Sequence, residues 1–518
     1  MKKIYYIVFT LFFVLIVLPV IDTFAGMFFS GDFSANLKQI NAGTFILLSK
    51  SILIALSVAT ISTILGIFLS FLLYKTQIPY SNYLKITLLI PLFISPYIMA
   101  VAWRDFFYLF FHRTDLISSV AGSIFVMVNI FTPLSMLIIG SALSNINAQL
   151  EESAQLIASL PKVVLKIILP LIKPAIISSF VLIFIFSISE FSVPAYFGVQ
   201  VFTTEIFTQF SAFYNHSLAV LQSLFLVLIC IFLLFTEAKY LAGAPFLSVG
   251  AKGTKNKTFQ LKRKNTAFGF IIFYLVITVV FPLTVLFIQS FKNGTDKFIE
   301  AFGLLLPTFV NSFELAFWAA FFTMITGFSA AYFSVHNAKN KLNVLFNWFL
   351  LIVFAIPSII FGISLIKFYN QAELAFIYTS AALIIIAYVG KFSFISAKII
   401  ENSLVQIPKS LDEAAQIEGI SPSRRLFKII IPLIMPALFA AFMISFIFNL
   451  GELVISIMLY PPGMEIMPVK VYTLMANAPQ ALTSSMTLIV FLISLFIISV
   501  FYLIFKKFIR ANNSITKY

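Results

Sequence analysis

Long apolar runs, each of about 20 residues, limit most strongly what this chain can fold into. Examples are residues 4–20, 52–74 and 481–505. A run of about that length can cross the hydrocarbon core of a bilayer as one helix, since a helix satisfies its own backbone hydrogen bonds there. With 61% hydrophobic and only 10% charged residues, the chain has too few polar groups to cover the surface of a soluble protein. The sequence therefore predicts an all-α integral membrane protein, with the lipid bilayer as its surroundings.

Positive charge is concentrated in alternate polar segments. Clusters of Lys and Arg occur, for example, at residues 2–3, 252–264 and 506–510, whereas Asp22, Glu205 and Glu465 lie in intervening segments. This alternation follows the positive-inside rule, so it indicates orientation in a membrane. The net charge of +15 is therefore not evidence for a nucleic-acid partner. Both termini are expected in the cytoplasm, which requires an even number of spans.

The chain contains an internal duplication. About twelve spans are predicted, six on each side of a basic linker, with the fifth span of each half at roughly 174–197 and 436–460. The two sets match at a nearly constant offset of 261 or 262 positions. Matching pairs include Ser51 and Ser312, Ala55 and Ala316, Gly66 and Gly327, Pro96 and Pro357, and Glu190 and Glu452. Six is an even number, so the repeats run parallel to each other. The expected organisation is a first half at 1–245, a linker at 246–266 and a second half at 267–518.

Each half carries one polar island between its fourth and fifth spans, on the basic side. The first begins EESAQLIASLPKVVLKIILP at residue 151, and the second reads DEAAQIEGISPSRRLFKIIIP at 412–432. The second copy predicts a short helix capped by Ser410, a turn at Gly419 and a second helix that enters the membrane. Gly419 suits the turn because glycine readily adopts positive φ. The alternative for a single copy is an ordinary interfacial helix, but two copies at equivalent positions favour a function.

The spacing of this island resembles the cytoplasmic loop of type I ABC (ATP-binding cassette) importer permeases. Glu413, Ala414, Ala415 and Gly419 fall on that pattern in the second copy, whereas the first keeps Glu152 and Ala154 and has Ala158 in place of the glycine. The resemblance implies type I cores at about 47–240 and 308–503, and a location in a bacterial plasma (inner) membrane. It also implies that both islands couple to two copies of an ATPase subunit, alongside an extracytoplasmic substrate-binding protein. The degenerate first copy predicts unequal coupling by the two halves.

No constellation for catalysis or for metal binding is visible in the sequence. A phosphate-binding G-x-x-x-x-G-K-[ST] loop is missing, and the three histidines are scattered singly. We therefore expect a transport subunit that is not an enzyme and binds no metal or cofactor of its own. ATP hydrolysis would belong to a partner subunit.

Two other classes of polytopic membrane protein fit the sequence less well. A secondary transporter can also have two parallel six-span halves, but such carriers usually show a Gly- and Arg-rich loop after the second span. Here that loop reads YKTQIPYSNYLK. A polytopic membrane enzyme is disfavoured because no acid/base cluster is present.

Glu190 and Glu452 are the candidates for the translocation pathway, because ionisable residues within spans are costly and usually functional. The alternative is a carboxylate satisfied by backbone or by a neighbouring Ser or Tyr. The stretch GELVISIMLYPPG, which begins at Gly451, resembles ferric-iron importer permeases, and fused halves also suit that family. The resemblance implies iron(III) as substrate, while thiamine, polyamines and phosphonates remain open.

Overall fold

The computed structural model describes residues 2–29, 33–241, 259–261, 263–292, 294–337 and 340–515. Across these residues the fold is all-α, apart from an isolated bridge between Thr76 and Phe259. Nine helices in this part of the chain are long and apolar enough to cross a membrane, and the number rises to twelve when three bent pairs each count as one span. This result confirms the predicted fold class. Most of the predicted linker at 246–266 lies outside the described residues.

Six spans and several short helices make up the first half. In chain order they are α1 (Lys2–Phe12), η1 (Phe13–Val17), α2 (Leu18–Phe29), α3 (Phe33–Gln39), α4 (Ala42–Lys75), α5 (Ser81–Thr87), η2 (Ile90–Phe93), α6 (Pro96–Phe111), α7 (Val120–Ser144), α8 (Ala148–Ile157), α9 (Leu160–Val163), η3 (Val164–Ile168), α10 (Leu169–Leu171), α11 (Lys173–Ser189), α12 (Ser192–Tyr196), α13 (Phe202–Ser211) and α14 (His216–Leu241).

The second half repeats this order. It contains α15 (Lys264–Leu275), η4 (Val276–Val280), α16 (Phe281–Phe291), α17 (Asp296–His336), α18 (Lys341–Ala355), α19 (Ser358–Tyr369), η5 (Ala372–Leu374), α20 (Ala375–Tyr378), α21 (Ala381–Val405), α22 (Lys409–Ile417), α23 (Pro422–Arg425), η6 (Leu426–Ile430), α24 (Ile431–Gly451), α25 (Val454–Leu459), α26 (Met467–Met475) and α27 (Gln480–Ile515). Helices α4, α7, α8, α11 and α14 thus correspond to α17, α21, α22, α24 and α27.

Equivalent glycines allow the two central helices of each half to pack closely. Helix α4 packs along α7, and α17 packs along α21. A Cβ atom on Gly66 would lie 2.1 Å from Ser135 Oγ, and one on Gly327 would lie 2.4 Å from Ser396 Oγ. Both glycines are therefore needed because a side chain would push the paired helices apart, as at other small-residue helix crossings in membranes.

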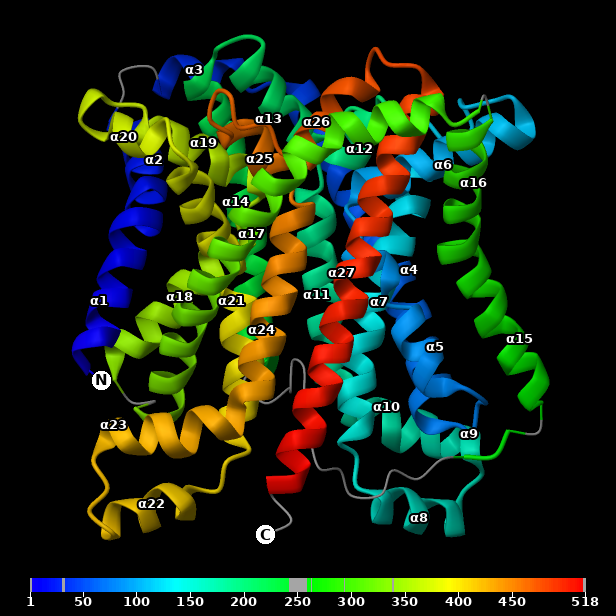
Figure 1. Cartoon of the computed structure of the whole chain (residues 1–518), viewed down its shortest axis with the longest axis vertical. Coiled ribbons are helices and arrows are strands. Elements are labelled where there is room, and N and C mark those ends of the chain that lie inside the picture. Colours follow the sequence, from blue (N-terminus) through cyan, green and yellow to red (C-terminus); the bar gives the residue numbers. More distant parts are fainter. Residues whose placement is uncertain are drawn as a thin grey trace.

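The first span of each half packs against the other half. Helix α2 contacts α19, and the Tyr369 hydroxyl donates a hydrogen bond to the Leu15 carbonyl (2.9 Å). In the reciprocal contact α16 packs on α6, where the Phe281 and Phe106 rings stack. Figure 1 shows α1–α2 beside α18–α20 on one flank and α15–α16 beside α5–α6 on the other. The two repeats therefore interlock rather than form separate bodies.

Both polar islands lie on the same side of the molecule. In Figure 1, α8 and α22–α23 project at the bottom, where α1 begins and α27 ends, whereas α3, α13, α20 and α26 lie at the top. This arrangement agrees with an even number of spans.

Candidate functional site

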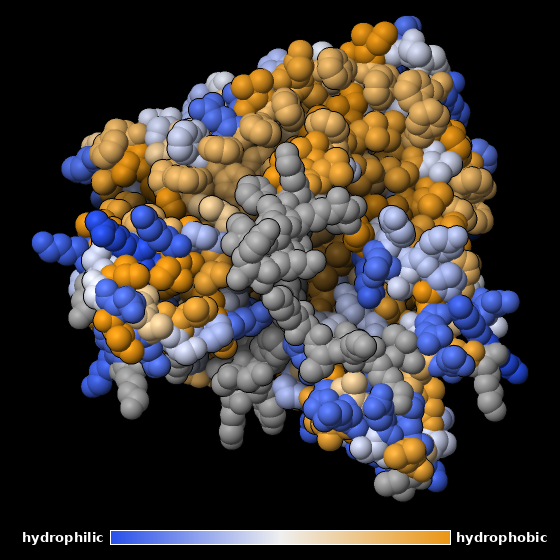
Figure 2. Space-filling view, turned by 60° about the horizontal axis from the view of Figure 1, so that its bottom comes forward, coloured by the Kyte–Doolittle hydropathy of each residue, from blue (hydrophilic) through white to orange (hydrophobic). Residues whose placement is uncertain are grey.

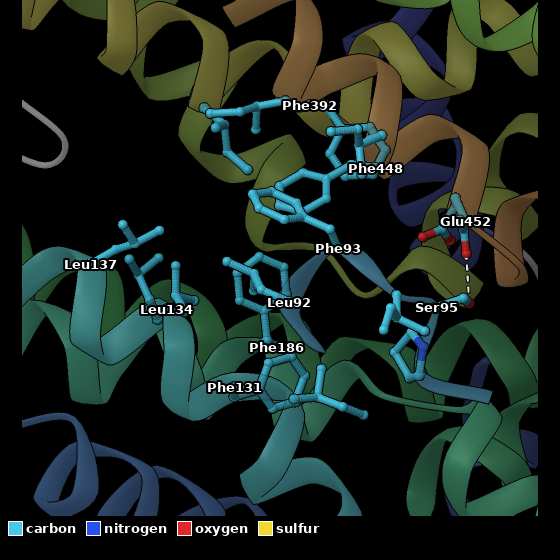
Figure 3. Close-up of a pocket in the computed structure, with 18 of the residues that line it drawn as sticks. Leu92, Phe93, Ser95, Phe131, Leu134, Leu137, Phe186, Phe392, Phe448 and Glu452 are labelled. Atoms are coloured by element: carbon cyan, nitrogen blue, oxygen red, sulfur yellow. Dashed lines mark hydrogen bonds between the residues drawn. The ribbon is translucent and has the colours of Figure 1, made fainter. Parts of the chain in front are cut away.

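A cavity of about 180 Å³ lies between the two halves. Its walls come from the α5–α6 connection, α7 and α11 of the first half and from α18, α21 and α24 of the second. Figure 3 shows phenylalanines from both halves facing this space, with Ser95 and Glu452 at one end. The cavity is thus mostly aromatic and aliphatic, with few polar groups.

The walls of the cavity consist largely of repeat-equivalent residues. Its lining contains the pairs Phe93 and Phe354, Phe131 and Phe392, Phe186 and Phe448, Leu182 and Ile444, and Glu190 and Glu452. The two members of each pair are 261 or 262 positions apart in the sequence. The cavity therefore lies where equivalent surfaces of the two halves face each other, and both predicted glutamates belong to its lining.

Glu190 lies at a break in its span. Helix α11 ends at Ser189, and Glu190 has an extended backbone (ψ 126°) before the short helix α12 begins. Its Oε1 accepts hydrogen bonds from the backbone N–H of Ser192 (2.7 Å) and of Val193 (3.2 Å), and from the Ser192 hydroxyl. The carboxylate therefore caps α12, in the way that acidic side chains commonly cap helices. The prediction of one continuous span from about residue 174 to residue 197 was therefore wrong.

Glu452 repeats this arrangement in the second half. Helix α24 ends at Gly451, the Glu452 backbone is extended (ψ 113°), and its Oε1 accepts from the N–H of Ile455 (3.2 Å) at the start of α25. The Ser95 hydroxyl, from the first half, donates to the Gly451 carbonyl (2.8 Å; dashed line in Figure 3). The predicted continuous span 436–460 was likewise wrong. Both glutamates line the cavity and also satisfy local backbone donors.

Lys391, next to the cavity residue Phe392, is a charged residue that was not among the predicted candidates. It is buried in α21, and its Nζ donates to the carbonyls of Phe354 (3.0 Å) and Ile356 (2.6 Å). These carbonyls lie where the chain bends by 108° between α18 and α19. Lys391 also interacts electrostatically with Glu452. Its counterpart in the first half is Ile130, so the first half does not repeat this charge.

Lys391 could have been singled out from the sequence, because a lysine within an apolar run is costly unless it has partners. No group of three His, Cys, Asp or Glu side chains that could hold a metal ion lies among the described residues. The arrangement can therefore offer two carboxylates to a passing cation, but not a chelating cluster.

The two polar islands form helix–turn–helix loops that expose apolar side chains at equivalent positions. Leu156 at the end of α8 is 89% exposed, and its repeat partner Ile417 at the end of α22 is 86% exposed. Leu150 and Leu411, six residues earlier in each helix, are also exposed. Figure 2, in which this side comes forward, shows hydrophobic patches among hydrophilic residues on the projecting parts.

The predicted residues of these loops differ in their surroundings. Glu152, Glu413 and Ala414 are exposed, Ala415 is buried, and Ala154 and Ala158 are partly buried. These residues lie on two separate loops, and none of them lines the cavity. The structure thus places the predicted site residues in two groups, the glutamates at the cavity and the loop residues on the side of the termini.

The turns of the two loops use different backbone conformations. Gly419 has φ +69°, as predicted, and its N–H bonds to the Gln416 carbonyl while that of Ile420 bonds to the Ala415 carbonyl. Ala158 instead has an extended backbone (φ −137°, ψ 149°), so the shorter first loop needs no glycine. The prediction that Ser410 caps α22 was wrong, because the helix begins at Lys409 with Pro408 at the capping position.

Comparisons with known proteins agree with this architecture. Residues 323–511 match the family described as "Binding-protein-dependent transport system inner membrane component". The chain is 24% identical to the Fe(3+)-transport system permease protein FbpB 2 of Haemophilus influenzae, over 86% of this chain and 88% of that protein. It is 25% identical to the ferric transport system permease protein FbpB of Actinobacillus pleuropneumoniae, over 84% and 68%. A putative 2-aminoethylphosphonate permease protein, PhnV of Salmonella paratyphi A, is 28% identical over 44% of this chain and 87% of its own length. The chain thus resembles importer permeases, with similarity to the ferric transporters along most of its length.

Proposed function

We propose that this chain is the permease subunit of a binding-protein-dependent ABC importer, with iron(III) as its substrate. The observation that carries the proposal is the pair of equivalent projecting loops on one side of a duplicated membrane fold, together with a cavity built from both repeats. The similarity to ferric transport permeases along most of the chain supports the same conclusion.

The loops supply the contact with the ATPase in this proposal. Leu156 and Ile417 are large apolar side chains left almost fully exposed on short helices. Burial of such a side chain by a partner protein is favourable and therefore stabilises the complex. Two equivalent loops suit two copies of one ATPase subunit, each contacted by one half. We place ATP hydrolysis on that partner because this sequence has no phosphate-binding loop.

Orientation follows from the same contact. Since an ATPase works in the cytoplasm, the side that carries α8 and α22 would be cytoplasmic, and with it the start of α1 and the end of α27 (Figure 1). The binding protein would then dock on the opposite side, over α3, α13, α20 and α26. We propose that the chain is divided into a first half at 1–245, a linker at 246–266 and a second half at 267–518. The first span of each half nevertheless packs against the other half.

The cavity supplies the pathway. Its lining comes in pairs from the two halves, so a relative movement of the halves would open or close it. Glu190 and Glu452 place carboxylate oxygens from both halves at this cavity, and Fe³⁺ is a hard cation that favours oxygen ligands. With two carboxylates and no third acidic side chain among the described residues that line the cavity, the site would pass the ion on rather than hold it tightly.

Substrate identity is tested by uptake in cells that lack this chain. We expect loss of uptake of radiolabelled iron(III), and recovery when the chain is restored on a plasmid. Uptake of a labelled aminophosphonate, polyamine and thiamine is measured in the same cells. Loss of one of these together with unchanged iron uptake would keep the permease proposal and replace the iron assignment.

A further inference from the structure

We propose that the segment Phe259–Leu261, which leads into the second half, works with a buried ion pair as a strut that fixes the first loop helix, α8, against the cytoplasmic end of α4. The name strut is used below for Lys75, Glu151 and Phe259. The position of α8 is then set by the chain that connects the two halves, whereas the described residues of the second half show no matching contact on α22.

The ion pair joins the two helices directly. Lys75 is the last residue of α4, Glu151 lies in the first turn of α8, and Lys75 Nζ is 2.6 Å from Glu151 Oε1. Both side chains are 0% exposed. A buried charge is costly unless its partner stays in place. The two residues therefore resist separation far more than a surface pair would.

Phe259 is inserted beside this pair. Its backbone N–H donates to the Lys75 carbonyl (2.7 Å), and its carbonyl accepts from the N–H of Gln77 (3.3 Å), so the segment pairs with the chain just after α4. The Phe259 ring stacks on Phe71 of α4 (6.2 Å between centroids). It is buried in an apolar cluster to which Ala154 of α8 and Ala158, the residue directly after this helix, also contribute. Phe259 thus bonds to α4 and packs in the same cluster as α8.

The second half has different chemistry at these positions. The counterparts of Lys75 and Phe71 are His336 and Tyr332. His336 is exposed, and its ring stacks on Tyr332 (4.2 Å). An exposed imidazole therefore lies on the ring whose counterpart in the first half is covered by Phe259. The counterpart of Glu151 is Asp412, whose side chain lies outside the described residues.

The strut has a consequence for coupling, which rests on the proposed function. Helix α8 would move as one body with α4, so a push on the first loop reaches the membrane helices directly. Helix α22 would keep freedom to adjust. The two loops would then differ in mechanics for a reason other than their turn residues, Ala158 and Gly419.

Spin labels on the isolated, detergent-purified chain test the strut without any ATPase. Leu156→Cys and Ile417→Cys supply two equally exposed labelling sites in a Cys230→Ala background. Phe259→Leu and Glu151→Gln are each expected to increase the mobility of the label at 156 and to leave that at 417 unchanged. Leu261→Ala is the matched control, since Leu261 lies on the same segment but packs against a different cluster with Ile271. Equal mobility changes at both labels, or none at 156, would overturn the strut.

A double substitution tests the ion pair itself. Lys75→Met and Glu151→Leu, made singly, each leave a buried charge without its partner and should shift α8 toward the released state by roughly 100-fold or more. The two together replace the pair with apolar groups and should restore low mobility at 156. If the double variant is as mobile as the single ones, the ion pair does not hold α8. Because no partner protein takes part, these outcomes do not depend on whether the chain couples to an ATPase.

Discussion

Replacement of Ile417 by serine tests the proposed ATPase contact most sharply. The side chain is 86% exposed in the isolated chain, so a docked ATPase could bury nearly all of it. Full burial of an isoleucine side chain contributes about 1.5–3 kcal/mol. Loss of that contribution weakens binding by about 10- to 150-fold, at 1.4 kcal/mol for each factor of ten.

The assay measures the dissociation constant of the purified ATPase subunit for the chain in nanodiscs. Leu156→Ser should weaken binding to a similar degree, since Leu156 is 89% exposed at the equivalent position. The effects of the two substitutions should add, because the sites are separate. Phe376→Ser is the matched control, as this side chain is 72% exposed on α20 at the opposite side (Figure 1). Unchanged affinity in both loop variants would refute the reasoning.

Three further predictions concern the loops, the cavity and the helix crossings. Glu413→Ala or Gly419→Ala should lower transport-coupled ATPase activity in the reconstituted complex more than the equivalent changes in the first loop, Glu152→Ala or Ala158→Gly. At the turns the reason is the backbone, because the positive φ at Gly419 costs an alanine about 1 kcal/mol whereas the first turn is extended; equal losses from the two loops would contradict the prediction. Glu190→Gln and Glu452→Gln keep an oxygen that accepts from the helix N–H groups, so expression and melting temperature should stay unchanged. Uptake of labelled substrate should fall, since the carboxylate itself is lost. A fall in melting temperature alone would indicate that these residues act only as helix caps. Gly66→Ala should lower the melting temperature because its Cβ would meet Ser135, while Gly303→Ala, with open space around it, should not; equal shifts would argue against close packing at that crossing.

Composition and periodicity were sufficient to predict the fold class and the turn at Gly419. Apolar runs report which segments can cross a membrane, and the constant offset reports the duplication. A glycine between a short helix and a Ser-Pro pair indicates a turn, and its φ of +69° confirms that prediction.

Other features depend on contacts that no local pattern records. The breaks at Glu190 and Glu452 occur within apolar runs, where hydropathy cannot distinguish a continuous helix from two pieces. The exchange of first spans between halves arises from packing such as that between Tyr369 and Leu15, which are 354 positions apart. Ser410 failed as a cap because α22 already begins at Lys409, one residue before it, with Pro408 at the capping position. Lys391 was overlooked although its charge within a span was visible.

The central claim, that this chain forms an importer only with a separate ATPase, is tested most directly in proteoliposomes. The chain is reconstituted together with its ATPase subunit, the binding protein is supplied on the substrate side, and uptake of labelled iron(III) is followed with and without ATP. The account predicts uptake that requires ATP, the ATPase and the binding protein together. Accumulation of substrate by the chain alone, driven by an ion gradient, would contradict it and indicate a secondary transporter.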